Sequence, residues 1–393
     1  MTDGPICFAG NAVLGRGGQG EFLRQMVFAL NQLPGGRILS RNAQADRAEC
    51  INLPFTGWRN TCFRAIASTP FLRRRRDLLT WIDDVDFDSR LSARIAGAGL
   101  LDAVMGQCCD TFELLRKKNT PLVLTALNTH IDSLAELLSD EHRRLQMDLP
   151  SFIYPGMRLR VRREIECAGR IRAVSELVKR SFVERGVKPE KVEVLLPAVD
   201  LDYFRPVPKG DDVFRVLAVL TIDPRKGAYY LLQAFEKAAI PNSELVVIGA
   251  TGDRWSSQMW GQFRARLPNI HMQSADVLRE PIEATYGRAS VLVHPAIEDG
   301  FGLAINQALA CGKPVIATRQ TGASQLITEG ENGYVVEARD VDGLVDRLRF
   351  LAREPSLLQR LGAAASASVS GLGYPSMARD VARFYSRMLE THV

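Results

Sequence analysis

The chain has 393 residues, of which 46% are hydrophobic and 24% charged, as in ordinary globular proteins. Its formal net charge of +5 is too weak to favour nucleic acid as a partner. The 7 cysteines are an odd number without framework spacing, which predicts reduced thiols in a cytoplasmic protein. No apolar run reaches the roughly 18 residues of a membrane span, and the opening segment MTDGPICFAG does not resemble a signal peptide.

Short β-like runs alternate with amphipathic helical patterns along the chain. Strands are predicted at Ile6–Gly10, Arg37–Ser40, Glu49–Leu53, Leu122–Ala126, Ile171–Val174 and Val192–Leu196. A second series follows at Val216–Leu220, Leu245–Ile248, Ile270–Met272, Val291–His294, Val315–Ala317 and Tyr334–Val336. Helices between them include Glu21–Gln32, Leu231–Lys237 and Val341–Arg353. This alternation indicates parallel sheets covered on both faces, so the predicted fold class is α/β, with doubly wound Rossmann-like domains.

The strand–helix pattern begins twice, which predicts two domains. The join, FRPVPKGDDVF at residues 204–214, has the proline, glycine and aspartate content of a linker. We therefore predict an N-terminal domain over residues 1–203 and a C-terminal domain over residues 204–373. In such folds ligands bind where strands end and helices begin, so the expected site is the crevice between the two halves.

The first strand is followed by the glycine-rich segment NAVLGRGGQGEF. Gly15, Gly17, Gly18 and Gly20 allow close approach of a ligand to the backbone, and a following helix offers unpaired N–H groups to an anion. The spacing fits a dinucleotide fingerprint, but Arg41 lies where a ribose-binding acid is expected, which weakens an NAD interpretation. By itself the segment is either a binding loop or a flexible turn.

Two further loops follow strands of the second series. Arg225 and Lys226 precede a helix, an arrangement that suits a phosphate or diphosphate but also describes a solvated basic turn. The segment Asp299-Gly300-Phe301-Gly302 follows Val291–His294, and a helix is expected from about Leu303. Both loops direct helix N–H groups to the same edge of the sheet.

From about Glu164 to Glu337 the chain resembles the family-4 (group 1) retaining glycosyltransferases of the two-domain GT-B type. The segments that carry the resemblance are RAVSELVKRSFVERGVKPEKVEVLLPAVDLDYFRP, PRKGAYYLLQAF, LVVIGATGD and HPAIEDGFGLAINQALACGKPVIATRQTGASQLITEGENGYVV. The first domain matches more loosely, through GRGGQGEF and LVLTALNTHIDSLAELLSDEH. YPSMARDVARFYSRMLE resembles the family's closing helix, which implies that residues 374–393 cross back onto the first domain.

The resemblance implies transfer of a sugar from a nucleotide-sugar donor to an acceptor hydroxyl, with retention of configuration. Lys226, supported by Arg225, is implied to stabilise the departing diphosphate, and His130 is implied to face the sugar. Asp299 completes the implied catalytic set. The implied donor-binding residues are Gly17, Gly18, Glu298, Gly300, Phe301, Gly302, Leu303, Gln307 and, for the base, Val277. The family requires no dedicated protein base, and neither a metal nor a cofactor is implied.

The sequence departs from the family pattern at two places. The family has two glutamates separated by seven residues, whereas here the pair is Asp299 and Gln307, or Glu298 and Asn306 if shifted by one. The family often has an arginine five residues before the lysine, where this chain has Thr221. Since the second acid binds ribose hydroxyls in relatives, these departures leave donor affinity in question. We expect Gln307 to contact ribose more weakly than an acid would.

Three interpretations follow. The first is an active glycosyltransferase that builds a bacterial polysaccharide or glycolipid. The second is a nucleotide-sugar-binding partner subunit that has lost turnover, and the third is a nucleotide-sugar epimerase.

Two charged segments of the first domain have alternative interpretations. The segment DDVDFDSR, residues 83–90, is predicted to be a solvated acidic loop rather than a metal site. The basic runs FLRRRRDLL (71–79) and MRLRVRREIE (157–166) indicate either a solvated face or peripheral contact with the inner face of the cell membrane. Acceptors on lipid carriers would explain such contact.

Overall fold

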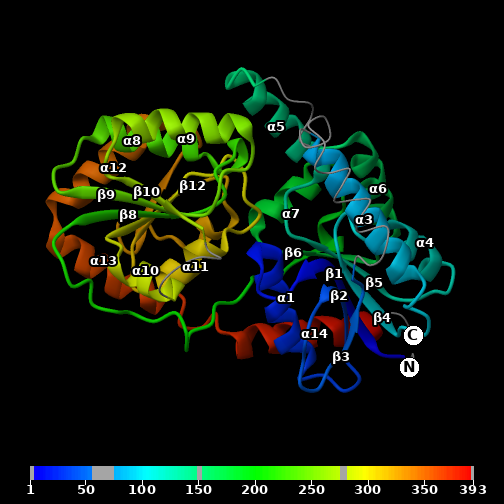
Figure 1. Ribbon diagram of the computed structural model, residues 1–393. Helices are drawn as coiled ribbons and strands as arrows, with labels where there is room; N and C mark the ends of the chain where they lie inside the picture. Colours follow the sequence, from blue (N-terminus) through cyan, green and yellow to red (C-terminus); the bar gives the residue numbers. More distant parts are fainter. Residues whose placement is uncertain (1–3, 55–74, 148–152, 275–280, 391–393) are drawn as a thin grey trace. The chain divides into compact units, whose positions relative to one another are not determined.

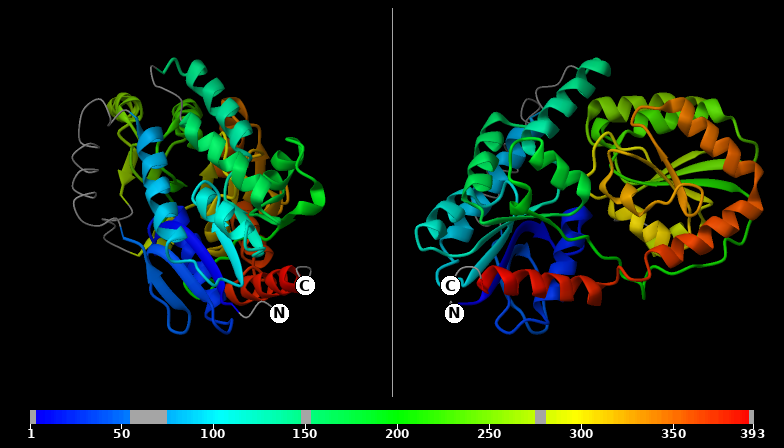
Figure 2. Two further views of the ribbon diagram at one scale, coloured as in Figure 1. Left: turned by 90° about the vertical axis from the view of Figure 1, so that its right-hand side faces the viewer. Right: turned by 180° about the vertical axis from the view of Figure 1, so that it is seen from behind.

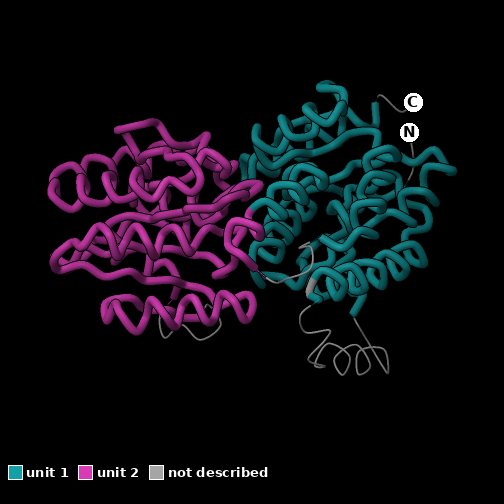
Figure 3. The backbone as a smooth tube through the Cα atoms, turned by 90° about the horizontal axis from the view of Figure 1, so that it is seen from above, with its two compact units in different colours: residues 1–140, 148–197, 374–393 teal, residues 141–147, 198–373 magenta. Residues whose placement is uncertain are grey.

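The computed structural model describes residues 4–54, 75–147, 153–274 and 281–390. The chain divides into two compact units (Figure 3). Unit 1 comprises residues 1–140, 148–197 and 374–393, and unit 2 comprises residues 141–147 and 198–373. The main segment of unit 2 begins at Ala198, inside the region that the sequence assigned to the first domain.

Unit 1 is built on a parallel sheet in the order β3-β2-β1-β4-β5-β6-β7. The strands are β1 (Ile6–Val13), β2 (Arg37–Asn42), β3 (Glu49–Asn52), β4 (Leu100–Val104), β5 (Leu122–Ala126), β6 (Arg170–Ala173) and β7 (Val192–Val194). The helices are α1 (Gly17–Leu30), α3 (Arg76–Ser92), α4 (Cys109–Arg116), α5 (Ile131–Arg144), α6 (Pro155–Cys167), α7 (Glu176–Val183) and α14 (Tyr374–Glu390).

Helices cover both faces of this sheet, which explains why its strands are apolar on both sides. α1 and α14 lie side by side, whereas α3, α4 and α6 lie on the other face (Figures 1 and 2). Tyr374, the first residue of α14, donates a hydrogen bond from its hydroxyl to Glu21 Oε1 of α1 at 2.7 Å. The C-terminal helix is therefore part of unit 1, although about 180 residues of chain separate it from β7.

Strand β4 lies in the middle of the sheet, and the sequence analysis did not predict it. Its central residue, Asp102, is fully buried and accepts hydrogen bonds from the Thr125 and Tyr385 hydroxyls, the latter at 2.7 Å. Arg172 Nη1 lies 3.4 Å from the same carboxylate, and both side chains are inaccessible to solvent. A buried charged residue interrupts the apolar run by which a central strand is normally predicted, so LLDAV gave no clear signal.

Unit 2 is built on a parallel sheet in the order β10-β9-β8-β11-β12-β13. Its strands are β8 (Phe214–Val219), β9 (Ser243–Ile248), β10 (Ile270–Gln273), β11 (Val291–His294), β12 (Val315–Thr318) and β13 (Gly333–Val336). Its helices are α8 (Ala228–Ala238), α9 (Arg254–Arg266), α10 (Ile282–Arg288), α11 (Leu303–Ala310), α12 (Val341–Arg353) and α13 (Pro355–Ser368). α8, α9 and α12 cover one face, and α10, α11 and α13 cover the other (Figure 1).

The core of unit 2 forms because apolar residues of α8 and α12 pack on the buried strands. Leu231, Leu232 and Phe235 of α8 meet Leu344 and Leu348 of α12 in this cluster. A side-chain cap fixes the start of α12, as Asp340 Oδ1 accepts from the Gly343 N–H at 2.8 Å. The predicted α/β class, with two doubly wound parallel sheets, is confirmed.

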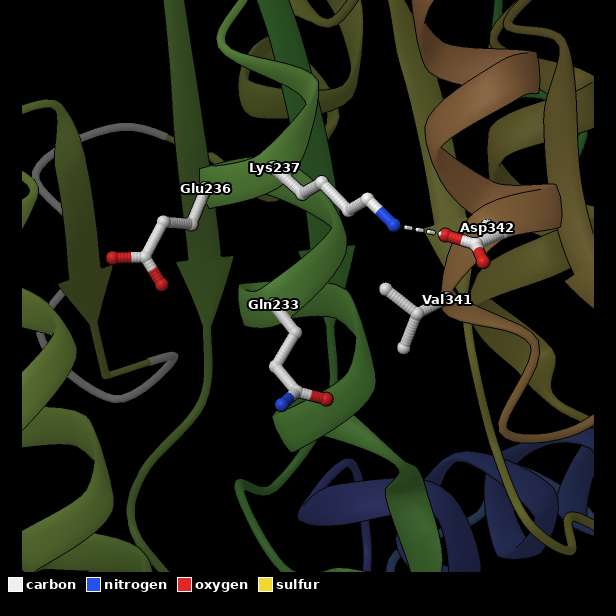
Figure 4. A pocket seen from close by; sticks show the side chains of 5 residues that line it. All are labelled: Gln233, Glu236, Lys237, Val341 and Asp342. Atoms are coloured by element: carbon white, nitrogen blue, oxygen red, sulfur yellow. Dashed lines mark hydrogen bonds and ion pairs between the residues drawn. The ribbon is translucent and has the colours of Figure 1, made fainter.

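The described residues also contain a surface pocket of about 440 Å³ between α8 and α12 (Figure 4). It is lined by Gln233, Glu236, Lys237, Val341 and Asp342, and Lys237 forms an ion pair with Asp342 across it. None of the residues predicted for the functional site lines this pocket.

Candidate functional site

The candidate site of unit 2 is formed by the loops that follow β8 and β11. These neighbouring strands mark the point where the strand order reverses, since β9 and β10 lie on one side of β8 and β11–β13 on the other. In open α/β sheets, ligands bind at the carboxyl ends of the strands at this point. The topology therefore brings residues 221–227 and 295–302 to the position where such folds bind ligands.

Backbone contacts hold the two loops together. The Ile297 N–H donates to the Arg225 carbonyl at 2.8 Å. Gly227 has a φ of +65°, and a Cβ there would lie 2.0 Å from the Pro295 carbonyl oxygen. Asp223 caps the intervening turn by accepting from the Lys226 N–H at 2.9 Å. Any side chain at position 227 would therefore push the loops apart.

Two adjacent ion pairs connect the loops through their side chains. Arg225 Nε lies 2.7 Å from Glu298 Oε2, and Lys226 Nζ lies 2.6 Å from Asp299 Oδ2. Burial alone would raise the pKa of Asp299, but the Lys226 ammonium and His294 hold it well below its ordinary range. Asp299 is therefore ionised at neutral pH. Four predicted site residues thus converge as two cations and two carboxylates.

His294 is a fifth member of this cluster, and sequence reasoning did not identify it. It is the last residue of β11, is 2% exposed, and places Nε2 2.9 Å from Asp299 Oδ2. Lys226 and His294 therefore contact the same carboxylate oxygen. A histidine at the end of an apolar strand, five residues before an acid, was the available signal.

The segment Gly300-Phe301-Gly302 is fixed by pairing with residues 320–323. Asp299 donates its N–H to the Gln320 carbonyl at 3.0 Å, and the Phe301 carbonyl accepts from the Ala323 N–H at 2.6 Å. Phe301 is 4% exposed, so its ring belongs to the core of unit 2. Gly300 is also buried. These residues shape the loop more than they line a surface.

Gly302 caps the start of α11 in a conformation that favours glycine. Its φ is +87°, and a Cβ there would lie 2.8 Å from Thr321 Cγ2 and 3.3 Å from His294 Nε2. The absence of a side chain therefore leaves the space next to the imidazole open.

Helix α11 exposes a single stripe. Leu303 and Gln307, one turn apart, are its two residues that are not buried. Gln307 Oε1 accepts a hydrogen bond from the hydroxyl of Tyr286, which is itself inaccessible, at 2.8 Å. By contrast, Asn306 is fully buried and donates to the Ala198 carbonyl at 3.2 Å. Of the two alignments with the family's glutamate pair, Asp299 with Gln307 is therefore the one that places the second residue at the surface.

In unit 1, Gly17 and Gly18 are the first residues of α1, which begins four residues before the predicted Glu21. Both are exposed, and a Cβ at either position would meet no other atom within 4 Å. A Cβ at Gly20, however, would lie 2.2 Å from the Val13 carbonyl oxygen. Gly20 is thus required for packing, while the surroundings of Gly17 and Gly18 leave room for a ligand.

His130 lies just before α5 and is 6% exposed. The backbone N–H of His130 donates to Ser181 Oγ at 2.9 Å. The ring Nδ1 accepts from the backbone N–H of Asp132 at 3.3 Å. Burial lowers the pKa of the imidazole. The ring is therefore neutral, with its proton on Nε2, and can donate one hydrogen bond.

The charged segments of unit 1 are largely paired within the unit. Residues 83–90 lie in α3, so the prediction of a solvated acidic loop is wrong. Asp83 and Asp86 pair with Arg41, at 2.7 and 3.1 Å. A cation from β2 thus offsets part of the acidic charge of this helix.

The basic run 157–166 lies in α6, and its arginines face carboxylates. Arg158 and Arg162 both contact Asp132, at 2.7 and 2.9 Å, and Arg160 pairs with Asp88 and Asp110. Two other predicted features, Val277 and the first part of the basic run 71–79, lie outside the described residues. Among the described residues, no helix is long and apolar enough to cross a membrane.

Comparisons with known proteins agree with this architecture. Residues 201–368 match the family model of the group 1 glycosyl transferases. The D-inositol 3-phosphate glycosyltransferase of Kribbella flavida is 28% identical over 253 residues, which cover 58% of each chain. D-inositol 3-phosphate glycosyltransferase 2 of Catenulispora acidiphila is 30% identical over 225 residues, or 52% of each chain. The chain thus spans about half the length of these curated relatives.

Solved structures match nearly the whole chain. Sucrose-phosphate synthase from Thermosynechococcus elongatus has a TM-score of 0.76 at 20% identity, covering 99% of this chain and 100% of that one. Anabaena HepE in complex with UDP and glucose has a TM-score of 0.70 at 16% identity, covering 98% and 99%. The protein therefore has the two-domain GT-B fold. Residues 201–368, most of its second unit, carry the group 1 glycosyl transferase domain.

Proposed function

We propose that this protein transfers a sugar from a nucleotide-sugar donor to an acceptor hydroxyl with retention of anomeric configuration, in the synthesis of a bacterial polysaccharide or glycolipid. The observation that carries the proposal is the convergence of Arg225 and Lys226 with the loop after β11 at the strand-order reversal of unit 2. Matches to group 1 glycosyltransferases support the reaction class.

The chemical requirement is stabilisation of the leaving group. As the bond to the sugar breaks, negative charge grows on the diphosphate, and a fixed cation in a partly buried position offsets it. Lys226 has three N–H donors, of which one is directed to Asp299, and its side chain is 20% exposed. It can therefore bind a phosphate oxygen while Asp299 holds it in place. We propose that Arg225 and Lys226 supply this charge without a metal.

For the nucleoside we propose the exposed stripe of α11. Leu303 and Gln307 are its accessible residues, and Gln307 is fixed by Tyr286. HepE has been solved in complex with UDP and with UDP-glucose, so uridine diphosphate sugars are the first donors to test. Val277 remains the proposed contact to the base.

For the sugar we propose His130 as a neutral hydrogen-bond donor, with Gly17 and Gly18 presenting backbone N–H groups. The acceptor is a saccharide or a lipid-linked saccharide. If the acceptor is lipid-linked, we propose that the protein contacts the inner face of the membrane peripherally. The ion pairs of Arg158 and Arg162 with Asp132 reduce the positive charge that α6 can offer to anionic lipids. Sedimentation with anionic liposomes across a salt series tests this contact, and an absence of binding at low salt would exclude it.

A panel of nucleotide sugars tests the function itself. A donor at 100 times its dissociation constant stabilises the protein by about 2.7 kcal/mol, which a thermal-shift assay detects. Nuclear magnetic resonance of the product then reports anomeric configuration. Binding without release of nucleoside diphosphate would instead identify a partner subunit, and product formed without an acceptor would identify an epimerase.

A further inference from the structure

We propose that His294 is a positioning residue that orients Lys226 through the carboxylate of Asp299. The inference rests on the proposed function, because it assigns a role within the same diphosphate-binding cluster. His294 Nε2 lies 2.9 Å and Lys226 Nζ lies 2.6 Å from the same oxygen, Asp299 Oδ2. A single carboxylate oxygen thus connects a buried ring of β11 to the ammonium of the facing loop.

The burial of His294 shows that this contact is not an incidental surface pair. Its side chain is 3% exposed, and its Nδ1 is buried with no hydrogen-bond partner among the residues that the structure describes. An unpaired buried polar atom destabilises a fold, and an apolar residue of similar size would avoid this penalty. The imidazole therefore contributes little to packing that leucine could not supply. Its distinctive interaction is the hydrogen bond to Asp299.

The surrounding backbone is built to admit the ring. Gly302 has a φ of +87°, and a Cβ at this position would lie 3.3 Å from His294 Nε2. The following residue opens α11, so the glycine that caps this helix also leaves room for the imidazole. The positions of His294 and Gly302 are thus sterically coupled.

The Asp299 carboxylate is contacted by Lys226 and by His294. The backbone N–H of Asp299 donates to the Gln320 carbonyl at 3.0 Å, which positions the main chain but not the carboxylate. Without the imidazole, the carboxylate could rotate with its lysine partner. Lys226 would then lose the fixed direction in which its remaining N–H groups face a phosphate.

The test compares His294→Leu, which removes the hydrogen bond, with His294→Gln, whose amide N–H can replace that of Nε2. A hydrogen bond to a charged group predicts that His294→Leu lowers kcat for the donor identified in the panel by about ten- to a hundredfold. KM should change by less than about threefold, a split expected when an interaction acts mainly in the transition state. His294→Gln should recover most of kcat. Thermal unfolding of both variants should stay near that of the wild type.

A double-mutant cycle separates positioning from a direct role. In an Asp299→Ala background, His294→Leu should cost little further activity, because the residue through which it acts is absent. Additive losses, or wild-type kcat in His294→Leu, would overturn the inference. If His294→Leu does not fold, His294→Ala, which also removes the hydrogen bond, replaces it in the same cycle and is judged by the same criterion.

Binding of inorganic pyrophosphate gives a readout that does not depend on turnover. By calorimetry at fixed salt, His294→Leu should bind pyrophosphate several-fold more weakly than the wild type, and His294→Gln should bind it nearly as well. Equal affinity in all three proteins would refute the positioning role. By contrast, a wild type that binds pyrophosphate but no nucleotide sugar would refute the proposed function and leave the role of His294 standing.

Discussion

Replacement of Gln307 by glutamate is expected to increase the affinity for the donor nucleotide. In the structure, the Tyr286 hydroxyl donates to Gln307 Oε1 at 2.8 Å, so the amide nitrogen is the part of the group left for a ligand. In Gln307→Glu, one carboxylate oxygen keeps the bond from Tyr286. The other replaces the amide nitrogen and can accept from a ribose hydroxyl.

The size of the gain follows from the kind of hydrogen bond formed. A neutral hydrogen bond contributes about 0.5–1.5 kcal/mol and one to a charged group about 1.5–3 kcal/mol. The exchange at Gln307 should therefore strengthen nucleotide binding by about 1–1.5 kcal/mol, or about five- to tenfold in Kd. Gln307→Ala should weaken binding, because it removes the contact altogether.

Isothermal calorimetry with UDP, and with the best donor of the panel, measures this change. Inorganic pyrophosphate is the matched control, since it shares the diphosphate but has no ribose. Its affinity should not increase in Gln307→Glu. An unchanged affinity for UDP, or an equal gain for pyrophosphate, would show that Gln307 lies away from the ribose and would refute the reasoning.

Three further predictions concern charge. Lys226→Met should lower kcat by about 10²–10³-fold, measured as release of nucleoside diphosphate, whereas a loss below tenfold would contradict its role. Burial opposes ionisation of Asp132, but hydrogen bonds from two arginines lower its pKa from 3.8 to about 2. Because the folded value lies below the unfolded one, Asp132→Asn should cost about 2 kcal/mol of unfolding free energy at pH 7. This difference in unfolding free energy should vanish as pH falls from about 4 to 2. A difference that stays constant over this range would show that the lowered pKa of Asp132 is not its source. Arg172→Met should cost about 3–5 kcal/mol in urea denaturation by leaving Asp102 unpaired, and adding Asp102→Asn should restore part of it. No recovery in the double variant would argue that the arginine acts through packing.

Local pattern predicted most of the fold. The apolar runs that became β8 and β11 and the helix Val341–Arg353 are readable because each element buries its own residues over a short length of chain. Strand β4 could not be predicted in this way, because Asp102 is acceptable in a central strand only through its contacts with Arg172 and Tyr385. Those partners lie 70 and 283 residues away, beyond any local pattern.

The same division applies to the candidate site. The sequence alone determined the two glycine-containing loops, their positions after parallel strands, and the acids and bases that they carry, because these depend on local spacing. Only the tertiary structure decided that Arg225 faces Glu298, that His294 joins Asp299, and that Tyr286 fixes Gln307. These choices depend on which strands lie side by side and which side chains meet in their interior. Such contacts join segments that are distant in the sequence and that come close only once the sheet has formed.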